Sequence, residues 1–232
     1  MMQFRPATGR GHAQLDWLDS WHSFSFGQYY NPDEMGFGAL RVINEDRVDP
    51  AAGFPPHSHQ DMEILTYVLE GGLRHRDSTG GTGVLRPGEM QVMSAGRGIT
   101  HSEMNDSRVD PVHFLQIWVV PGPRGLTPGY RQQPLDASAM RAGWQKVAAP
   151  ADEDAQFVLH QDARLWIGWP AAGSAWRQPL APERAYYLHV ARGRVQVGTH
   201  TLQSGDALGL KGEALLETVA GTDTELLLFD LA

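Results

Sequence analysis

Short apolar runs broken by glycine, proline and polar turns make up most of this chain. Ile64–Leu69 is rich in β-branched and aromatic residues, and Glu70–Gly72 predicts a turn into a short strand at Leu73–Arg76. Val84–Leu85 and Met90–Met93 predict two further strands around a Pro-Gly turn. Short strands at close spacing, bounded by glycine and proline, are typical of antiparallel barrels and jelly rolls. The pattern therefore predicts an all-β protein.

The later part of the first half carries the clearest alternation. Phe37–Asn44 predicts a strand, and in His113–Val120 alternate residues fall on opposite faces. Pro121–Pro134 is rich in proline and glycine, which favours a loop or linker. Leu135–Trp144 is compatible with a short helix, and the alanine, proline and acidic residues of Gln145–Asp154 favour a boundary region.

A weak internal repeat indicates two similar domains. The matching segments are Tyr67–Leu73 with Tyr187–Gly193, and Val84–Glu89 with Thr201–Asp206. We therefore predict two antiparallel β-barrel or jelly-roll domains in tandem, at residues 1–134 and 135–232. The second copy has no His-x-His before it, so we expect it to lack metal ligands and to have a structural role.

Two ligand-x-ligand patterns lie in the first domain: His57-Ser58-His59 and His101-Ser102-Glu103. Residues i and i+2 of a strand point to the same face, so each pair can reach one ion. Three imidazoles and one carboxylate suit Fe(II), Mn, Co, Ni, Cu or Zn, and suit Ca or Mg poorly. We predict a metal site of His57, His59, His101 and Glu103, with one or two positions open for a substrate oxygen or O2. The alternative is that His57 and His59 are ordinary strand histidines.

Other candidate residues have plainer explanations. His113 could join the metal, but the four-ligand set is already complete, so we expect a core or surface histidine. His12 and His22 lie in an aromatic-rich N-terminal segment and are expected to be structural. Phe24–Phe26 either packs this segment onto the barrel or helps to wall a pocket. The candidate wall residues are Phe26, Phe54, Met104 and Phe114.

Composition limits the classes of function. The 232 residues contain no cysteine, which excludes disulfides, thiolate metal sites and cysteine nucleophiles. A formal net charge of -8 argues against non-specific nucleic-acid binding and is otherwise explained by solubility. No apolar run approaches the roughly 18 residues of a membrane helix. The first ten residues lack the apolar core of a signal peptide, so we expect a cytoplasmic protein without membrane contact.

The two clusters resemble the motifs of the cupin superfamily. The first motif matches at Gly53, His57, His59, Glu63 and Gly71, and the second at Gly88, Gly96, His101 and Asn105. Ser94 stands where the second motif usually has proline. Within the cupins the whole chain resembles the pirin family, through Phe24–Gly27, the Pro-His-x-His entry, Thr66–Gly71, Gly96–Ile99 and His101–Glu103.

This resemblance implies a bicupin fold with metal in the N-terminal cupin only. It implies that His57, His59, His101 and Glu103 are the ligands, with Fe(II) the favoured ion, and that Glu63 has a supporting or structural role. It also implies quercetin 2,3-dioxygenase activity, in which a flavonol and O2 give a depside and carbon monoxide. Glu103 is then the candidate base that removes the proton of the flavonol 3-hydroxyl.

Two alternatives remain open. Some pirins are described as transcriptional co-regulators, so the chain could be a non-catalytic metal- and redox-sensing regulator that binds an unidentified protein partner. Another cupin activity, such as sugar isomerisation, usually needs a polar sugar-phosphate pocket, and the aromatic residues near the ligands argue against it. The expected small-molecule partners are a flavonol or related phenol and O2.

Overall fold

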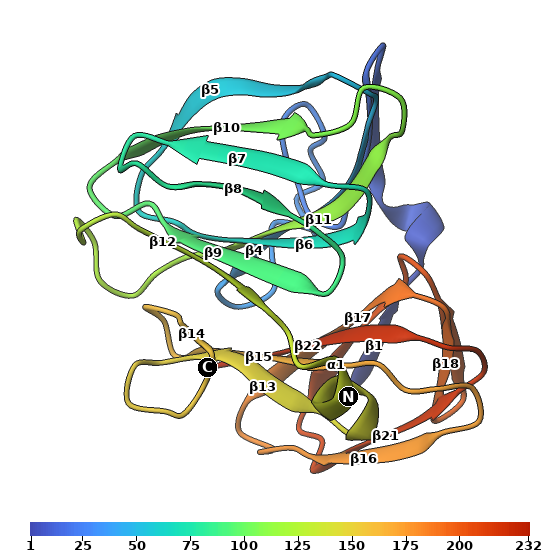
Figure 1. Cartoon of the computed structure of the whole chain (residues 1–232). Helices are drawn as coiled ribbons and strands as arrows, with labels where there is room; N and C mark the ends of the chain where they lie inside the picture. Colours follow the sequence, from blue (N-terminus) through green and yellow to red (C-terminus); the bar gives the residue numbers. More distant parts are fainter. The chain divides into compact units, whose positions relative to one another are not determined.

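The computed structural model describes all 232 residues, and nearly all regular structure in it is β-strand. The chain divides into two compact units, each built from a seven-stranded and a four-stranded sheet (Figure 1). The N-terminal unit comprises residues 11–36 and 40–135, and the C-terminal unit comprises residues 1–10, 37–39 and 136–232. The prediction of an antiparallel all-β protein is confirmed, since only the short β13–β14 pair is parallel.

The strand order of each sheet in the N-terminal unit is known from its hydrogen-bonded pairs. The seven-stranded sheet has the order β12 (Gly129–Pro134), β9 (Glu89–Ser94), β6 (Glu63–Glu70), β11 (Val112–Val119), β4 (Leu40–Val48), β3 (Leu18–His22) and β2 (Gly11–Leu15). The four-stranded sheet has the order β5 (Gly53–His59), β10 (Ile99–Asn105), β7 (Leu73–Asp77) and β8 (Thr82–Leu85). In Figure 1, β5, β10 and β7 run side by side.

The burial pattern explains why these segments form these sheets. In β10, alternate residues from Ile99 to Asn105 are buried, as expected for a strand with one face on a core. β11 is buried along nearly its whole length because β6 and β4 flank it on both sides. One apolar cluster between the sheets includes Val68, Leu73, Leu85 and Phe114, all at most 1% exposed.

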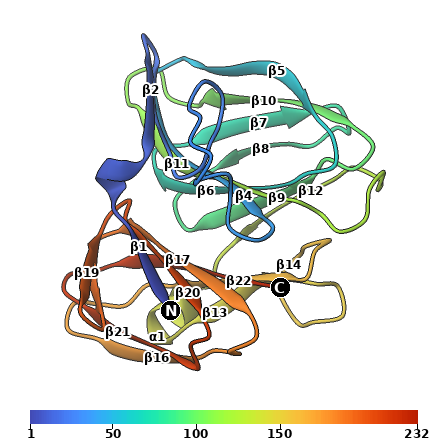
Figure 2. The same cartoon turned by 180° about the vertical axis from the view of Figure 1, so that it is seen from behind.

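The C-terminal unit repeats the two-sheet plan. Its seven-stranded sheet has the order β1 (Met2–Arg5), β20 (Ala207–Lys211), β17 (Ala185–Arg192), β22 (Glu225–Leu231), β15 (Ala163–Gly168), β13 (Gln145–Ala149) and β14 (Phe157–Val158). Its four-stranded sheet has the order β16 (Ala175–Pro179), β21 (Leu215–Ala220), β18 (Arg194–Val197) and β19 (His200–Gln203). Buried leucines and valines of β17, β18, β20 and β22 form its core. Figure 2 shows β1 close to β20, with which it pairs.

Two predicted irregular segments are strands instead. Pro121–Pro134 was expected to be a loop, but its end forms β12, which pairs with β9 at the edge of the sheet. Gln145–Asp154 was expected to be a boundary region, but its start forms β13. Glycine and proline are tolerated in edge strands, so their abundance in the first segment hid β12. The short helix predicted within Leu135–Trp144 is present as α1 (Ala137–Ala142), capped by the Asp136 carboxylate.

The boundary between the two units lies just before α1, and two segments from earlier in the chain belong to the C-terminal unit. The sequence places the division at 134/135, and the N-terminal unit ends at Leu135. Residues 1–10 and 37–39, which the sequence assigns to the first domain, belong to the C-terminal unit. The only other helix is the 3-10 turn η1 (Ala7–Gly9), so no helix here has the length and apolar character to span a bilayer.

Candidate metal centre

The two ligand-x-ligand patterns lie on neighbouring antiparallel strands. β5 and β10 pair so that His57 is directly opposite His101, whereas Glu103 is opposite Phe54. One residue of β10, Ser102, is therefore opposite two residues of β5, which places a β-bulge at Pro55 and Pro56. β5 is the edge strand of its sheet. Proline has no backbone N–H to donate, and an edge strand tolerates this because one of its sides has no partner strand. The bulge brings His57 into register with His101.

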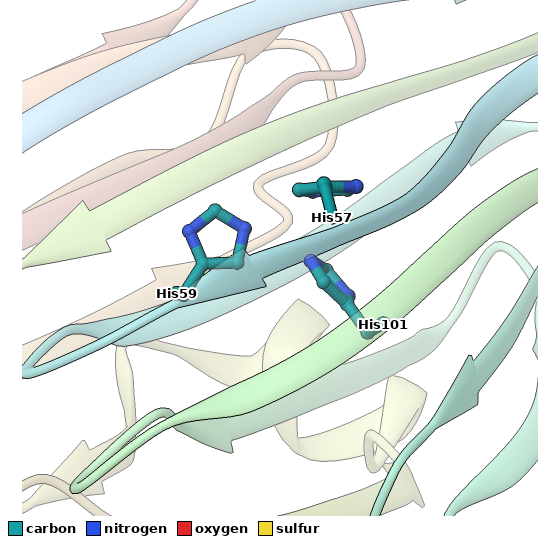
Figure 3. A group of neighbouring side chains, drawn as sticks. All are labelled: His57, His59 and His101. Atoms are coloured by element: carbon teal, nitrogen blue, oxygen red, sulfur yellow. The ribbon is translucent and has the colours of Figure 1, made fainter.

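The three histidines form one compact group. Their possible ligand nitrogens all lie within 4.8 Å of one another. The ring centroids of His57 and His101 are 4.4 Å apart, and those of His57 and His59, and of His59 and His101, are 4.8 and 4.9 Å apart. Figure 3 shows the rings gathered between β5 and β10. The three side chains could therefore bind one metal ion.

The chemical state of these rings fits a metal ligand. His57 Nδ1 lies 2.9 Å from the Pro55 carbonyl oxygen. Because a carbonyl only accepts, Nδ1 carries the hydrogen and Nε2 carries the lone pair. Burial, with the neighbouring His57, lowers the pKa of His59 from 6.5 to about 4. The His59 ring is therefore in the neutral form that coordinates a metal ion near neutral pH.

His101 provides the strongest sign of a missing partner. Its side chain is 1% exposed, and both ring nitrogens are buried without a hydrogen-bond partner. Burial, together with the nearby His57 and His59 rings, lowers the pKa of His101 to about 3. A neutral imidazole with two unsatisfied nitrogens is costly unless a cation or donor completes it. The donor set and its burial therefore fit a divalent transition-metal ion.

Glu103 lies beside this group but is not part of it. Its side chain is 2% exposed, and the Gln116 amide nitrogen donates to both carboxylate oxygens, at 2.8 and 2.9 Å. Burial raises the pKa of Glu103 to about 7, with the Asp46 charge acting in the same direction and the Gln116 hydrogen bond against it. The carboxylate lines the same cavity as His57 and His59. Its coordination to the ion stays a prediction.

A chain of buried polar groups leads away from Glu103. Gln116 Oε1 accepts from the Thr66 hydroxyl at 3.0 Å, and Gln91 lies between Thr66 and His75. His75 Nε2 lies 2.8 Å from the Asp77 carboxylate. The His75 ring stacks on Tyr130 and lies 5.4 Å from the His101 ring. These groups hold the carboxylate and the His101 side of the cluster in place.

The sequence reasoning missed His75 and Asp77, although a signal was present. His75-Arg76-Asp77 has the same i, i+2 spacing as the two predicted pairs, and β7 pairs directly with β10. In that register Asp77 is opposite His101 and His75 is opposite Glu103. The strand predicted at Leu73–Arg76 stops one residue short of Asp77, whereas β7 extends through Asp77.

A cavity of about 390 Å³ opens beside the histidines. This volume lies within the range of roughly 300–1,000 Å³ that small-molecule sites occupy. Of the predicted wall residues, Phe26 and Phe54 line it, together with Trp118, whose ring is 4.9 Å from that of His59. Phe114 instead lies in the apolar core, and Met104 does not line the cavity.

The remaining candidates are distributed as follows. His113 is 6% exposed and pairs with Glu45 at 2.9 Å, so it is a core histidine outside the cluster, as expected. Glu63 is 1% exposed and accepts from the Ser94 hydroxyl. His12 pairs with Asp19 on the surface. His22, expected to be structural, lines the cavity.

Two family models match the chain. Residues 3–119 match the model described as pirin, and residues 146–231 match the model described as the quercetinase C-terminal cupin domain. The second match coincides with most of the C-terminal unit. The two models together cover most of the chain, one in each half.

Whole-chain relatives agree with these matches. The quercetin 2,3-dioxygenase of Escherichia coli strain K12 is 43% identical over 231 residues, which cover 100% of this chain and 99% of that protein. A pirin-like protein of Caulobacter vibrioides is 38% identical over the full length of both. The crystal structure of the E. coli bacterial pirin YhhW in complex with nickel(II) matches with a TM-score of 0.93 and 42% identity, covering 100% of this chain and 99% of that one.

The paired double-sheet units and the histidine cluster define the molecule as a bicupin with a candidate metal centre in its N-terminal half. The chain belongs to the pirin family. The predicted family and fold class are therefore confirmed.

Proposed function

We propose that His57, His59, His101 and Glu103 hold one divalent transition-metal ion, with Fe(II) the favoured ion in the cell. The convergence of the His57 and His59 imidazoles on His101, whose ring nitrogens have no other partner, supports this proposal. Glu103 would add an oxygen ligand from the cavity side. Imidazole and carboxylate together accept most first-row divalent ions, and the nickel(II) bound to the E. coli relative fits that range.

We propose that the protein is a quercetin 2,3-dioxygenase-like oxidoreductase. It would open the heterocyclic ring of a flavonol with O2, giving a depside and carbon monoxide, so that both oxygen atoms enter the products. The single observation that carries the proposal is the position of the histidine cluster at a cavity walled by Phe26, Phe54 and Trp118. Such walls suit flat aromatic rings and exclude water from them.

Glu103 would remove the proton of the flavonol 3-hydroxyl. Its carboxylate is buried, faces the cavity and is held by the Gln116 amide, which fixes its orientation but leaves it able to accept a proton. A general base works best when its pKa lies near the working pH, and burial raises the pKa of Glu103 to about 7. A bound ion would supply a Lewis acid that stabilises the resulting oxyanion.

Oxygen consumption with quercetin tests this function. The metal-free protein should be reloaded separately with Fe(II), Mn(II), Co(II), Ni(II), Cu(II) and Zn(II), and each form assayed for O2 uptake and carbon monoxide release. We expect stoichiometric uptake and release with at least one redox-competent ion, and elemental analysis of freshly purified protein should identify the native ion. Tight metal binding without O2 uptake on any flavonol would instead favour the regulatory alternative.

A further inference from the structure

A second group of buried polar side chains lines the same cavity, on the sheet opposite the one that carries the histidines. Ser20 and His22 lie on β3, and Asn44 and Asp46 lie on β4. Each residue is at most 4% exposed. The strand register pairs Ser20 with Asp46 and His22 with Asn44. These four residues, here called the acceptor cluster, therefore form one compact patch in an otherwise largely apolar wall.

Within the acceptor cluster, His22 donates a hydrogen bond to Ser20, and Ser20 donates one to Asp46. The Ser20 hydroxyl donates to the Asp46 carboxylate. Its single hydrogen is then used, so its contact with His22 Nε2 at 2.8 Å requires the histidine to donate. The internal donors therefore converge on Asp46. Towards a molecule in the cavity, the cluster can therefore mainly accept hydrogen bonds.

Asn44 gives an independent indication of a ligand. Its Oδ1 atom is buried and has no hydrogen-bond partner, although the side chain lines the cavity. A buried carbonyl oxygen without a donor is costly and uncommon in folded proteins, so it indicates a donor supplied from outside the chain. Burial also raises the pKa of Asp46 to about 7, with the Ser20 hydrogen bond acting against it and the Glu45 and Asp19 charges acting in the same direction as burial.

Aromatic side chains connect the acceptor cluster to the histidines. The Phe26 ring packs edge-on against the His22 and Trp118 rings, with ring centroids 5.3 and 5.4 Å apart. The Trp118 ring in turn packs against the His59 ring, with centroids 4.9 Å apart. The cavity thus has polar groups on each of its two facing sheets, with flat apolar surfaces between them.

We propose that Ser20, His22, Asn44 and Asp46 form a second binding subsite, which accepts hydrogen bonds from hydroxyl groups on the outer rings of a polyhydroxylated aromatic substrate. The proposal rests on the proposed function, because it takes the reacting oxygen of a flavonol to lie at the histidine cluster. The subsite would then select among flavonols by the hydroxyl groups remote from the reacting position. A substrate without those groups leaves Asn44 unsatisfied.

The test compares two flavonols. Quercetin carries hydroxyl groups on both outer rings, whereas 3-hydroxyflavone carries none there. In Asn44→Leu, which keeps the branching of the side chain and removes the acceptor, the ratio of kcat/KM for quercetin to that for 3-hydroxyflavone should fall at least about fivefold. Most of the change should appear in KM, because the lost contact is remote from the reacting atoms. Ser20→Ala, which removes another acceptor oxygen of the subsite, should shift the ratio in the same direction.

A binding measurement separates this proposal from the proposed function. Nickel-loaded protein, kept without O2, is titrated with each flavonol by fluorescence quenching, and the ratio of the two Kd values should change as the kinetic ratio does. If no metal-loaded form of the protein consumes O2, the dioxygenase proposal fails. The ratio of the two Kd values still tests whether the subsite exists. Gln14→Leu, at an exposed position of β2 outside the cavity, should keep the wild-type ratio. The subsite would be overturned if Asn44→Leu and Ser20→Ala, where they fold, kept the wild-type ratio, or if Gln14→Leu showed an equal loss.

Discussion

At the scale of single residues, the buried and unpartnered ring of His101 is the feature that a metal ion would satisfy most directly. Its two buried nitrogens lack partners, and it lies opposite His57 in the strand pair. His101→Ala should therefore weaken metal binding at least about 100-fold, since loss of groups that merely support a ligand already costs 10–100-fold. Equilibrium dialysis with elemental analysis measures this. His12→Ala, the same change on the surface, should retain full metal content, and retained stoichiometry in His101→Ala would remove it from the ligand set.

Glu103 has two proposed roles that one substitution can separate. Glu103→Gln keeps the shape and an oxygen atom able to ligate, but it cannot take up the proton of the substrate hydroxyl. We expect kcat to fall by about 10²–10⁴ while a measurable part of the bound metal remains. Steady-state O2 uptake, normalised to bound metal, gives the result.

The matched control for Glu103 is Glu63, a buried carboxylate that the cupin motif also contains. Glu63 accepts from Ser94 and does not line the cavity. Glu63→Gln should therefore affect stability more than turnover per bound metal ion. Equal turnover losses in the two variants would show that neither carboxylate is specifically the base.

Asp46 should give the unfolding free energy a distinctive pH dependence. Burial raises its pKa to about 7 in the folded protein, compared with 3.8 for an ordinary carboxyl group. Between these values the folded state binds the extra proton, so this contribution to stability is present at low pH and is lost as pH rises towards 7. From pH 5 to pH 8, Asp46→Asn should gain on the order of 2 kcal/mol relative to wild type.

Urea unfolding of the metal-free proteins at both pH values measures this gain. Asn44→Ala, on the same strand face, removes a buried polar side chain without changing any titratable group. Its effect on stability should therefore be the same at pH 5 and pH 8. A constant difference between Asp46→Asn and wild type would contradict the effect of burial on this carboxyl group.

Residue-level patterns were enough to single out His57, His59 and His101, which the structure brings together, because an i, i+2 pair on a strand needs only local information. The acceptor cluster could not be found in that way. Ser20 and His22 are separated from Asn44 and Asp46 by more than twenty residues, and only the pairing of β3 with β4 joins them. A histidine in an aromatic segment gave no reason to expect a cavity wall at His22.

At the scale of elements, the close approach of β5 to β10 depends on a glycine. A Cβ atom on Gly53 would lie 2.3 Å from the Glu103 carbonyl oxygen and 2.6 Å from the Met104 Cα. Both are backbone atoms and cannot move without separating the strands. Gly53→Ala should therefore cost about 2–4 kcal/mol of stability and reduce metal binding, because it displaces β10 at Glu103. Chemical unfolding and metal titration measure the two effects.

Gly129→Ala is the control for this element. Gly129 also begins a strand of the N-terminal unit, but a Cβ atom there meets nothing within 4 Å. Its stability should stay within about 1 kcal/mol of wild type, with unchanged metal affinity. The cupin-like motif identified Gly53 from the sequence, whereas the bulge at Pro55 and Pro56 needed the strand register, which two consecutive prolines do not reveal.

At the scale of the whole molecule, the chain does not divide into two consecutive pieces. The internal repeat indicated two similar halves, because each half carries its own strand pattern. The repeat could not show that residues 1–10 pair with a strand about 200 residues later. Local alternation contains no information about the partner of an edge strand. Met2 and Phe4 are more than one-third exposed, so no strong apolar signal marks β1 either.

Deleting residues 1–10 should therefore loosen the C-terminal unit. β1 pairs with β20 from Met2 opposite Leu210 to Arg5 opposite Ala207, and the Ala7 amide donates to Asp206 at 2.6 Å. Without β1, β20 becomes an edge strand, and its outward amides lose their partners. Hydrogen exchange should accelerate at least tenfold in β20, whereas β11, central in the other unit, should exchange as in wild type. Unchanged protection of β20 would show that the pairing with β1 contributes nothing to the stability of that sheet.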